Sequence, residues 1–222
     1  MRAVLIPVKS LRDAKTRLAD ALDARARSEL VLAMLTDGIE ACLLSGVFDI
    51  VCVISDDSEV LWHARELGAK PLAEPAMRSG LNESLTFGQR YMARRVAVDE
   101  LLILPADVPL VQPDDVCAVA EALAGGPEQH VVIVPARDGG TNALALRPPE
   151  AIPMSFGADS ATAHRMAAER ARVAVTELAI ARLAFDVDDV ADVDALPSLP
   201  VGGATLGWLQ ARAHHAALDG GR

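Results

Sequence analysis

Short apolar runs rich in β-branched residues alternate with longer segments of helical periodicity along most of the chain. This alternation is typical of an α/β fold, in which helices cover both faces of a mostly parallel sheet. The predicted strands span residues 3–8, 48–55, 70–73, 99–104, 131–135, 142–147 and 184–187. The predicted helices span residues 24–45, 59–67, 81–95, 113–124 and 160–172, followed by a terminal helix.

The 222 residues fit one domain, because the chain contains no repeat, no low-complexity tract and no convincing linker. We therefore expect a single domain over residues 1–222, with a polar tail from about residue 213. Ligands of open α/β sheets bind beyond the carboxyl ends of the strands. The loops at Lys9, Asp107 and Asp188 are accordingly the places where a site is expected.

Composition excludes several function classes. The apolar runs are far shorter than the roughly 20 residues that cross a bilayer, so no membrane association is expected. The N-terminus opens directly into a predicted strand rather than a signal peptide, which favours a cytoplasmic location. Three separated cysteines, Cys42, Cys52 and Cys117, fit reduced core thiols rather than zinc ligands or disulfides.

The net charge of −10 argues against nucleic-acid binding, because an acidic protein repels a polyphosphate backbone. Basic residues nevertheless gather at the start of the chain, where a cationic loop favours a small anionic ligand. In this loop, Lys9, Lys15 and Arg17 could surround a triphosphate, although a solvated basic turn is about as plausible. The loop lacks the glycine pattern of a P-loop.

Carboxylates follow two of the predicted strands. Asp107 lies between Pro105 and Pro109 after an apolar strand, which suits coordination of a hard cation such as Mg²⁺. Its alternative role is a turn residue or a cap for the helix that begins near residue 113. Period-two alternation would place Asp186 and Asp188 on the same side of a strand end, although a solvated acidic edge is the alternative. Together with the basic loop, these carboxylates suit metal-assisted phosphoryl chemistry.

Two further segments could bind an anion. The stretch 138–142 could bring backbone amides, the Thr141 hydroxyl and the Asn142 amide to an anion, but an ordinary hairpin turn is favoured. In the stretch 156–160, Gly157 precedes Ser160, which is expected at a helix N-cap that could bind phosphate or carboxylate or serve only as a cap. The five histidines show no metal-ligand spacing, and none is a strong catalytic candidate.

Taken in order from residue 6 to about residue 196, these motifs resemble the 2-phospho-L-lactate and phosphoenolpyruvate guanylyltransferase family of the CofC/FbiD type. The resemblance rests on Ile6-Pro7-Val8-Lys9, Lys15-Thr16-Arg17-Leu18, Gly80-Leu81-Asn82, Leu104-Pro105-Ala106-Asp107-Val108-Pro109-Leu110, Gly139-Gly140-Thr141-Asn142-Ala143-Leu144, Phe156-Gly157-x-Asp159-Ser160 and Asp186-Val187-Asp188.

The resemblance implies a Rossmann-like nucleotidyltransferase fold of the GT-A type, a three-layer sandwich, and a role in coenzyme F-420 biosynthesis. It implies that Asp107, Asp186 and Asp188 hold metal ions, expected to be Mg²⁺. It also implies that Thr141, Gly157 and Ser160 bind the phosphorylated acid. The basic loop would meet the phosphates of GTP, and Leu81 and Asn82 would lie near the base.

The expected reaction is transfer of GMP from GTP to phosphoenolpyruvate, 2-phospho-L-lactate or 3-phospho-D-glycerate, with release of pyrophosphate. A phosphate monoester is largely dianionic at neutral pH, so it can attack without a protein base. Two alternatives stay open: another phosphorylated acceptor, such as a pterin or sugar phosphate, and a non-catalytic nucleotide-binding protein. The resemblance also suggests a homodimer.

Overall fold

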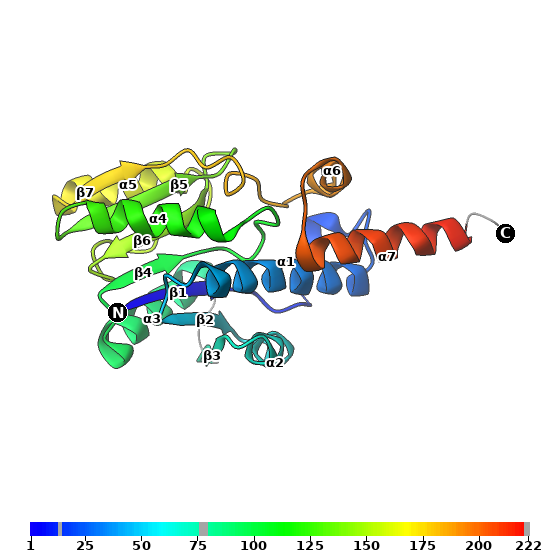
Figure 1. Ribbon diagram of the computed structural model, residues 1–222, viewed down its shortest axis with the longest axis horizontal. Coiled ribbons are helices and arrows are strands. Elements are labelled where there is room, and N and C mark those ends of the chain that lie inside the picture. The colour runs from blue at the N-terminus through cyan, green and yellow to red at the C-terminus, as the bar shows by residue number, and fades with distance from the viewer. Residues whose placement is uncertain (13–14, 76–79, 220–222) are drawn as a thin grey trace.

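The computed structural model describes residues 1–12, 15–75 and 80–219. In this part of the chain a seven-stranded sheet has the order β3-β2-β1-β4-β6-β5-β7 (Figure 1). Strand β6 runs antiparallel to both of its neighbours, and the other paired strands are parallel. The strands are β1 (Arg2–Pro7), β2 (Ile50–Ser55), β3 (Lys70–Ala73), β4 (Glu100–Ile103), β5 (His130–Pro135), β6 (Thr141–Arg147) and β7 (Ala174–Glu177). The predicted α/β class with a mostly parallel sheet is confirmed.

Helices cover both faces of this sheet (Figure 1). One face carries α1 (Ala24–Ser45), α2 (Ser58–Glu66), α4 (Pro113–Gly125), α6 (Val190–Ala195) and α7 (Gly203–Asp219), with the short 3-10 helices η1 (Thr16–Leu18) and η3 (Leu196–Ser198). The other face carries α3 (Leu81–Tyr91), its π-helical extension η2 (Met92–Val96), and α5 (Ser160–Ala171). None of the described helices is both long enough and apolar enough to cross a membrane.

Alternation along β1 explains the two layers of core. Val4 and Ile6 point into the core beneath α1 and α4, whereas Ala3 and Leu5 point into the core beneath α3. Gly88 lets α3 lie directly on the sheet, because a Cβ atom at this position would come within 2.5 Å of the Leu5 side chain. The sheet is therefore buried on both faces, as its continuous apolar strands require.

Two boundaries predicted from the sequence are wrong. Residues 184–187 form no strand, and the edge strand is β7, which pairs with β5 and has only partly buried or exposed side chains. A strand that buries little has a weak apolar pattern, so periodicity did not reveal it. The polar tail expected from about residue 213 is helical, since α7 continues to Asp219. Residues 220–222 of that expected tail, and Asp13 of the basic loop, lie outside the described residues.

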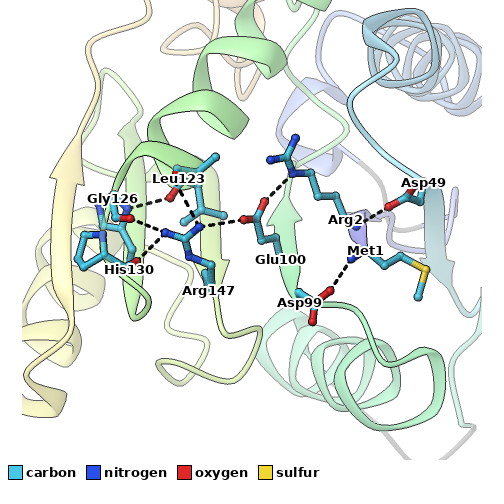
Figure 2. A network of polar contacts seen from close by, with 11 residues as sticks. Met1, Arg2, Asp49, Asp99, Glu100, Leu123, Gly126, His130 and Arg147 are labelled. Carbon is cyan, nitrogen blue, oxygen red and sulfur yellow. Dashed lines mark hydrogen bonds and ion pairs between the residues drawn. The ribbon is translucent and has the colours of Figure 1, made fainter.

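Charged side chains connect the strands at the end of the sheet where the parallel strands begin, which we call the amino edge (Figure 2). Glu100 at the start of β4 accepts from Arg2 of β1 at 2.7 Å and from Arg147 at the end of β6 at 3.1 Å. Arg147 also donates to the carbonyl oxygens of Gly126 and Pro127, both at 2.6 Å. This network joins three strands and the end of α4, at the edge opposite the loops where ligands are expected.

Candidate active site

Three carboxylates and one ammonium group gather where β1 and β4 end. Lys15 Nζ lies 2.6 Å from Asp107 Oδ2 and 3.1 Å from Asp188 Oδ1. Asp186 belongs to the same group, because the charges of Asp107 and Asp188 both act on its carboxyl. We call these four residues the carboxylate cluster. Three of them were predicted as metal ligands and the fourth as a triphosphate contact, so the structure brings together residues that are as much as 173 positions apart.

The backbone around residue 187 explains why two of these carboxylates share one side. The Val187 amide donates to the carbonyl of Asp107 at 3.0 Å, which ties this segment to the loop after β4. Val187 is buried, whereas Asp186 and Asp188 are half-buried. The prediction that Asp186 and Asp188 lie on the same side of the chain is therefore correct, although the segment forms no strand.

The electrostatics of the cluster reflect a concentration of negative charge. Burial, followed by repulsion from Asp107 and Asp188, raises the pKa of Asp186 to about 6. Burial opposes the charged form of Lys15, but ion pairing with Asp107 and Asp188 outweighs it and raises the pKa of the ammonium group. Within the described residues, no three His, Cys, Asp or Glu side chains are arranged as a ready metal-ligand set. Asp107 and Asp188 instead share the Lys15 ammonium.

The alternative role of Asp107 as a helix cap is wrong. Helix α4 is capped by a reciprocal pair in which Gln112 is the N-cap and Asp115 accepts from the Gln112 amide at 2.9 Å. Asp107 is thus free of a capping role, and its carboxylate faces Lys15.

The basic loop also makes a hydrogen bond to the N-terminus of α2. Asp57, the N-cap of α2, accepts from the Leu11 amide at 3.0 Å. Lys15 itself has a left-handed backbone with φ of 49°, which an L-residue adopts only with strain. Lys9 and Arg17 are exposed and make no ion pair with any described residue, so the structure does not bring them to the carboxylate cluster.

A second cluster lies at the start of β6 and α5. The hydroxyl oxygens of Thr141 and Ser160 are 2.9 Å apart, and Thr141 Oγ1 lies 3.1 Å from His164 Nδ1. All three side chains are buried, and we call them the hydroxyl cluster. The predicted turn before Thr141 is confirmed, because Asp138 accepts from the Gly140 amide at 2.8 Å between antiparallel β5 and β6.

Asn142 lies on the other side of β6 from Thr141, because Thr141 contacts His164 of α5 whereas Asn142 contacts Leu183 in the core of the opposite face. Its Nδ2 donates to the Leu183 carbonyl at 2.9 Å, and its side chain also hydrogen-bonds the Asp186 carboxylate. The side chain predicted as a ligand donor therefore supports a member of the carboxylate cluster. Because Thr141 and Asn142 are consecutive, the start of β6 connects the two clusters.

The remaining predicted residues lie at the start of α3 and in the loop before α5. Gly157 is exposed with φ of 137°, a conformation that favours glycine, and its carbonyl accepts from the Ser160 amide at 3.2 Å. Asn82 donates to the Phe156 carbonyl at 2.9 Å and accepts from the Phe156 amide at 2.7 Å. Leu81 packs against the core beneath α3. The Asn82 amide thus holds the loop before α5, and its place near the base stays a prediction.

Sequence reasoning missed two supporting groups. His164 was not predicted as a site residue. Its spacing of four residues from Ser160 puts both on one helix face, and this spacing is the sequence signal that could have identified it. Arg137 stacks on Phe185 with its guanidinium carbon 4.1 Å from the ring centroid and pairs with Asp192 at 2.8 Å. Asp192 in turn accepts from the Asp188 amide at 2.8 Å. No sequence pattern connected these distant residues.

Comparison with known proteins identifies the family to which this chain belongs. The family model described as "Guanylyl transferase CofC like" matches residues 1–198. A phosphoenolpyruvate guanylyltransferase from Sphaerobacter thermophilus is 41% identical over 203 residues, covering 90% of this chain and 95% of that protein. One from Rubrobacter xylanophilus is 42% identical over 192 residues, covering 86% and 91%.

Solved structures share the fold at much lower identity. A nucleotidyl transferase from Methanothermobacter superposes with a TM-score of 0.64 at 16% identity, covering 95% of this chain and 99% of that one. The match of the family model across most of the chain, with the two curated relatives, is what assigns the family. The chain belongs to the CofC-like guanylyl transferase family.

Proposed function

We propose that this protein transfers GMP from GTP to a small phosphorylated acid, with release of pyrophosphate, in coenzyme F-420 biosynthesis. Phosphoenolpyruvate is the first candidate acid, because it stands in the names of the similar proteins from Sphaerobacter and Rubrobacter. The observation that carries the proposal is the carboxylate cluster: three aspartates around one lysine, at the edge of the sheet where such folds bind ligands.

Asp107, Asp186 and Asp188 would hold a divalent cation, which we propose to be Mg²⁺. The donor set fits, because carboxylate oxygens are the ligands that this hard cation prefers, and because burial and then repulsion from Asp107 and Asp188 raise the pKa of Asp186, an effect that a bound cation would oppose. When bound, the cation would neutralise charge on the reacting phosphates.

Side chains of this protein would do the remaining work. Lys15 is fixed by two carboxylates and would stabilise negative charge on the departing pyrophosphate, with Lys9 and Arg17 available from the exposed loop. Thr141, Ser160 and Gly157 would hold the acid and align its phosphate with GTP. Since the phosphate of the acid is itself the nucleophile, the reaction needs no covalent enzyme intermediate.

The direct test is pyrophosphate release from GTP and Mg²⁺ with phosphoenolpyruvate, 2-phospho-L-lactate and 3-phospho-D-glycerate supplied separately. We expect release with at least one acid, most strongly phosphoenolpyruvate. Silence with all three, from protein that still binds GTP, would instead favour a pterin or sugar phosphate acceptor or a non-catalytic role.

Replacing Asp107 with Asn tests the metal role. Asp107→Asn keeps the size of the side chain and removes its charge, so we expect turnover to fall at least about 1000-fold while thermal unfolding changes little. Retained turnover would contradict the assignment of Asp107.

On the sequence argument alone, we also propose that the protein works in the cytoplasm as a single domain without nucleic acid. The family resemblance suggests a homodimer, which light scattering of the purified protein would test.

A further inference from the structure

In the hydroxyl cluster, the position of the proton on His164 is fixed by a hydrogen bond to the ring nitrogen that does not contact Thr141. The Ser155 backbone amide donates to His164 Nε2 at 3.1 Å. A backbone amide is always a donor, so Nε2 must carry a lone pair rather than a proton. The ring is fully buried, and this burial lowers its pKa to about 4, so the imidazole is neutral at neutral pH. A neutral imidazole has one N–H group, which must therefore be at Nδ1.

This tautomer determines the direction of the next hydrogen bond. Nδ1 lies 3.1 Å from Thr141 Oγ1, so the ring donates and the hydroxyl oxygen of Thr141 accepts. The bond between the Thr141 and Ser160 hydroxyls, at 2.9 Å, then uses one of their two hydrogens. Whichever hydroxyl donates in that bond, the other keeps a hydrogen. In the described part of the chain neither hydroxyl has a further partner for it.

The opposite tautomer would produce the opposite site. With the proton at Nε2, the Ser155 amide would face another donor and Nδ1 would accept from Thr141. Thr141 would then accept from Ser160, and both hydroxyl hydrogens would be consumed within the cluster. The cluster would present only lone pairs, which repel an oxyanion. The Ser155 contact therefore decides whether this cluster donates to a ligand or accepts from one.

We propose that His164 is a positioning residue that makes the Thr141–Ser160 pair a donor of one hydrogen bond to an oxyanion of the acid substrate. This inference rests on the proposed function for the identity of the ligand, and it deepens that function by assigning how the site selects an anionic oxygen. The remaining hydrogen needs an acceptor, and the carboxylate and phosphate oxygens are the strongest acceptors that the acid substrate offers.

Two neutral variants of His164 separate its two hydrogen bonds. In His164→Asn the amide nitrogen takes the place of Nδ1 and can still donate to Thr141. In His164→Gln the amide lies farther out, on the side of Ser155, and the donor to Thr141 is lost. Both keep a neutral polar side chain at the buried position, so each is the control for the other.

We expect His164→Gln to raise KM for phosphoenolpyruvate about tenfold, because the pair keeps one unused hydrogen but loses the donor that holds the Thr141 oxygen and so directs that hydrogen. We expect KM for GTP to stay within about twofold, and His164→Asn to restore most of the affinity for the acid. An unchanged KM for the acid in His164→Gln, or a parallel rise in both KM values, would overturn the inference.

The tautomer can be measured without turnover. Nitrogen-15 chemical shifts of His164 in the wild-type protein should show a protonated Nδ1 and an unprotonated Nε2, and the reverse would overturn the inference. This measurement also separates the two proposals. If wild-type protein uses none of the three acids, the proposed function fails, while the nitrogen shifts still confirm or contradict the tautomer.

Discussion

Lys15 is the residue on which the carboxylate cluster depends. Its ammonium is nearly buried, with 13% of the side chain exposed, and it is shared by Asp107 and Asp188. Without this cation, three carboxylates would face one another in a partly buried site, where like charges repel strongly. A fixed cation beside a proposed metal and triphosphate is also well placed to stabilise charge that develops during the reaction.

The variant Lys15→Met should therefore lower kcat about 100-fold or more, because it removes the charge while keeping a long side chain. Steady-state pyrophosphate release measures the effect. Lys70→Met is the matched control, since Lys70 lies on edge strand β3 near Tyr91, and it should leave kcat unchanged. Equal rates for Lys15→Met and wild type would remove Lys15 from the proposed mechanism.

His164 should make stability depend on pH. Its pKa is about 4 in the folded protein against 6.5 for an exposed histidine, so the unfolded chain takes up a proton first as pH falls. The stabilisation that the neutral imidazole gives the folded protein is complete above about pH 6.5. As the pH falls towards 4, the free energy of unfolding decreases by roughly 3 kcal/mol.

Urea unfolding of wild type and His164→Asn between pH 4.5 and 7 would measure this loss as a difference. The comparison with the variant is needed because the raised pKa values of Asp37 and Asp186 change stability in the opposite direction as pH falls. A difference that does not vary with pH would show that His164 is not buried in its neutral form.

At the scale of elements, one buried carboxylate joins the last helix to the first long one. Asp37 of α1 accepts from the amides of Ala204 and Thr205 at 2.6 and 3.0 Å, which satisfies the N-terminus of α7. These amides have no helical partner of their own. The contact explains why α7 lies along α1 in Figure 1.

Asp37→Ala should lower the free energy of unfolding by about 1–3 kcal/mol, because it leaves these donors without an acceptor. Hydrogen exchange should accelerate in α7 more than in the rest of the chain. Asp37→Asn keeps one acceptor oxygen and should lose less. Uniform acceleration across all elements would show that α7 does not depend on this cap.

In the whole molecule, the carboxyl edge and the amino edge of the sheet have different roles. The carboxyl edge carries both clusters of the candidate site, whereas the amino edge is joined by Glu100 and its two arginines (Figure 2). Glu100 has 12% of its side chain exposed, so its loss would leave the Arg147 guanidinium, on a side chain that is 21% exposed, and the more exposed Arg2 guanidinium without their carboxylate.

Glu100→Gln should therefore destabilise the protein by roughly 1–3 kcal/mol in urea unfolding, without changing KM for GTP or for the acid. A change in either KM with unchanged stability would show that the two edges are coupled.

The α/β class, nearly all the helices and, apart from His164, the residues of both clusters could be predicted from the sequence. This was possible because apolar periodicity and turn residues are local signals, and because the resemblance ordered the motifs. Asp107 was found from its position after a strand. Ser160 was predicted as a helix N-cap, which is wrong, because the N-cap of α5 is Asp159 and Ser160 is the first helical residue.

The contacts that these residues make depend on the tertiary structure. It placed Lys15 between Asp107 and Asp188, turned Asn142 towards Asp186, and put His164 behind Thr141. The weak edge strand β7 and the segment 184–187 likewise depend on partners far away in the chain. Hydrogen bonds and ion pairs between distant residues leave no periodic trace in a single sequence, so chain folding alone decides which groups meet.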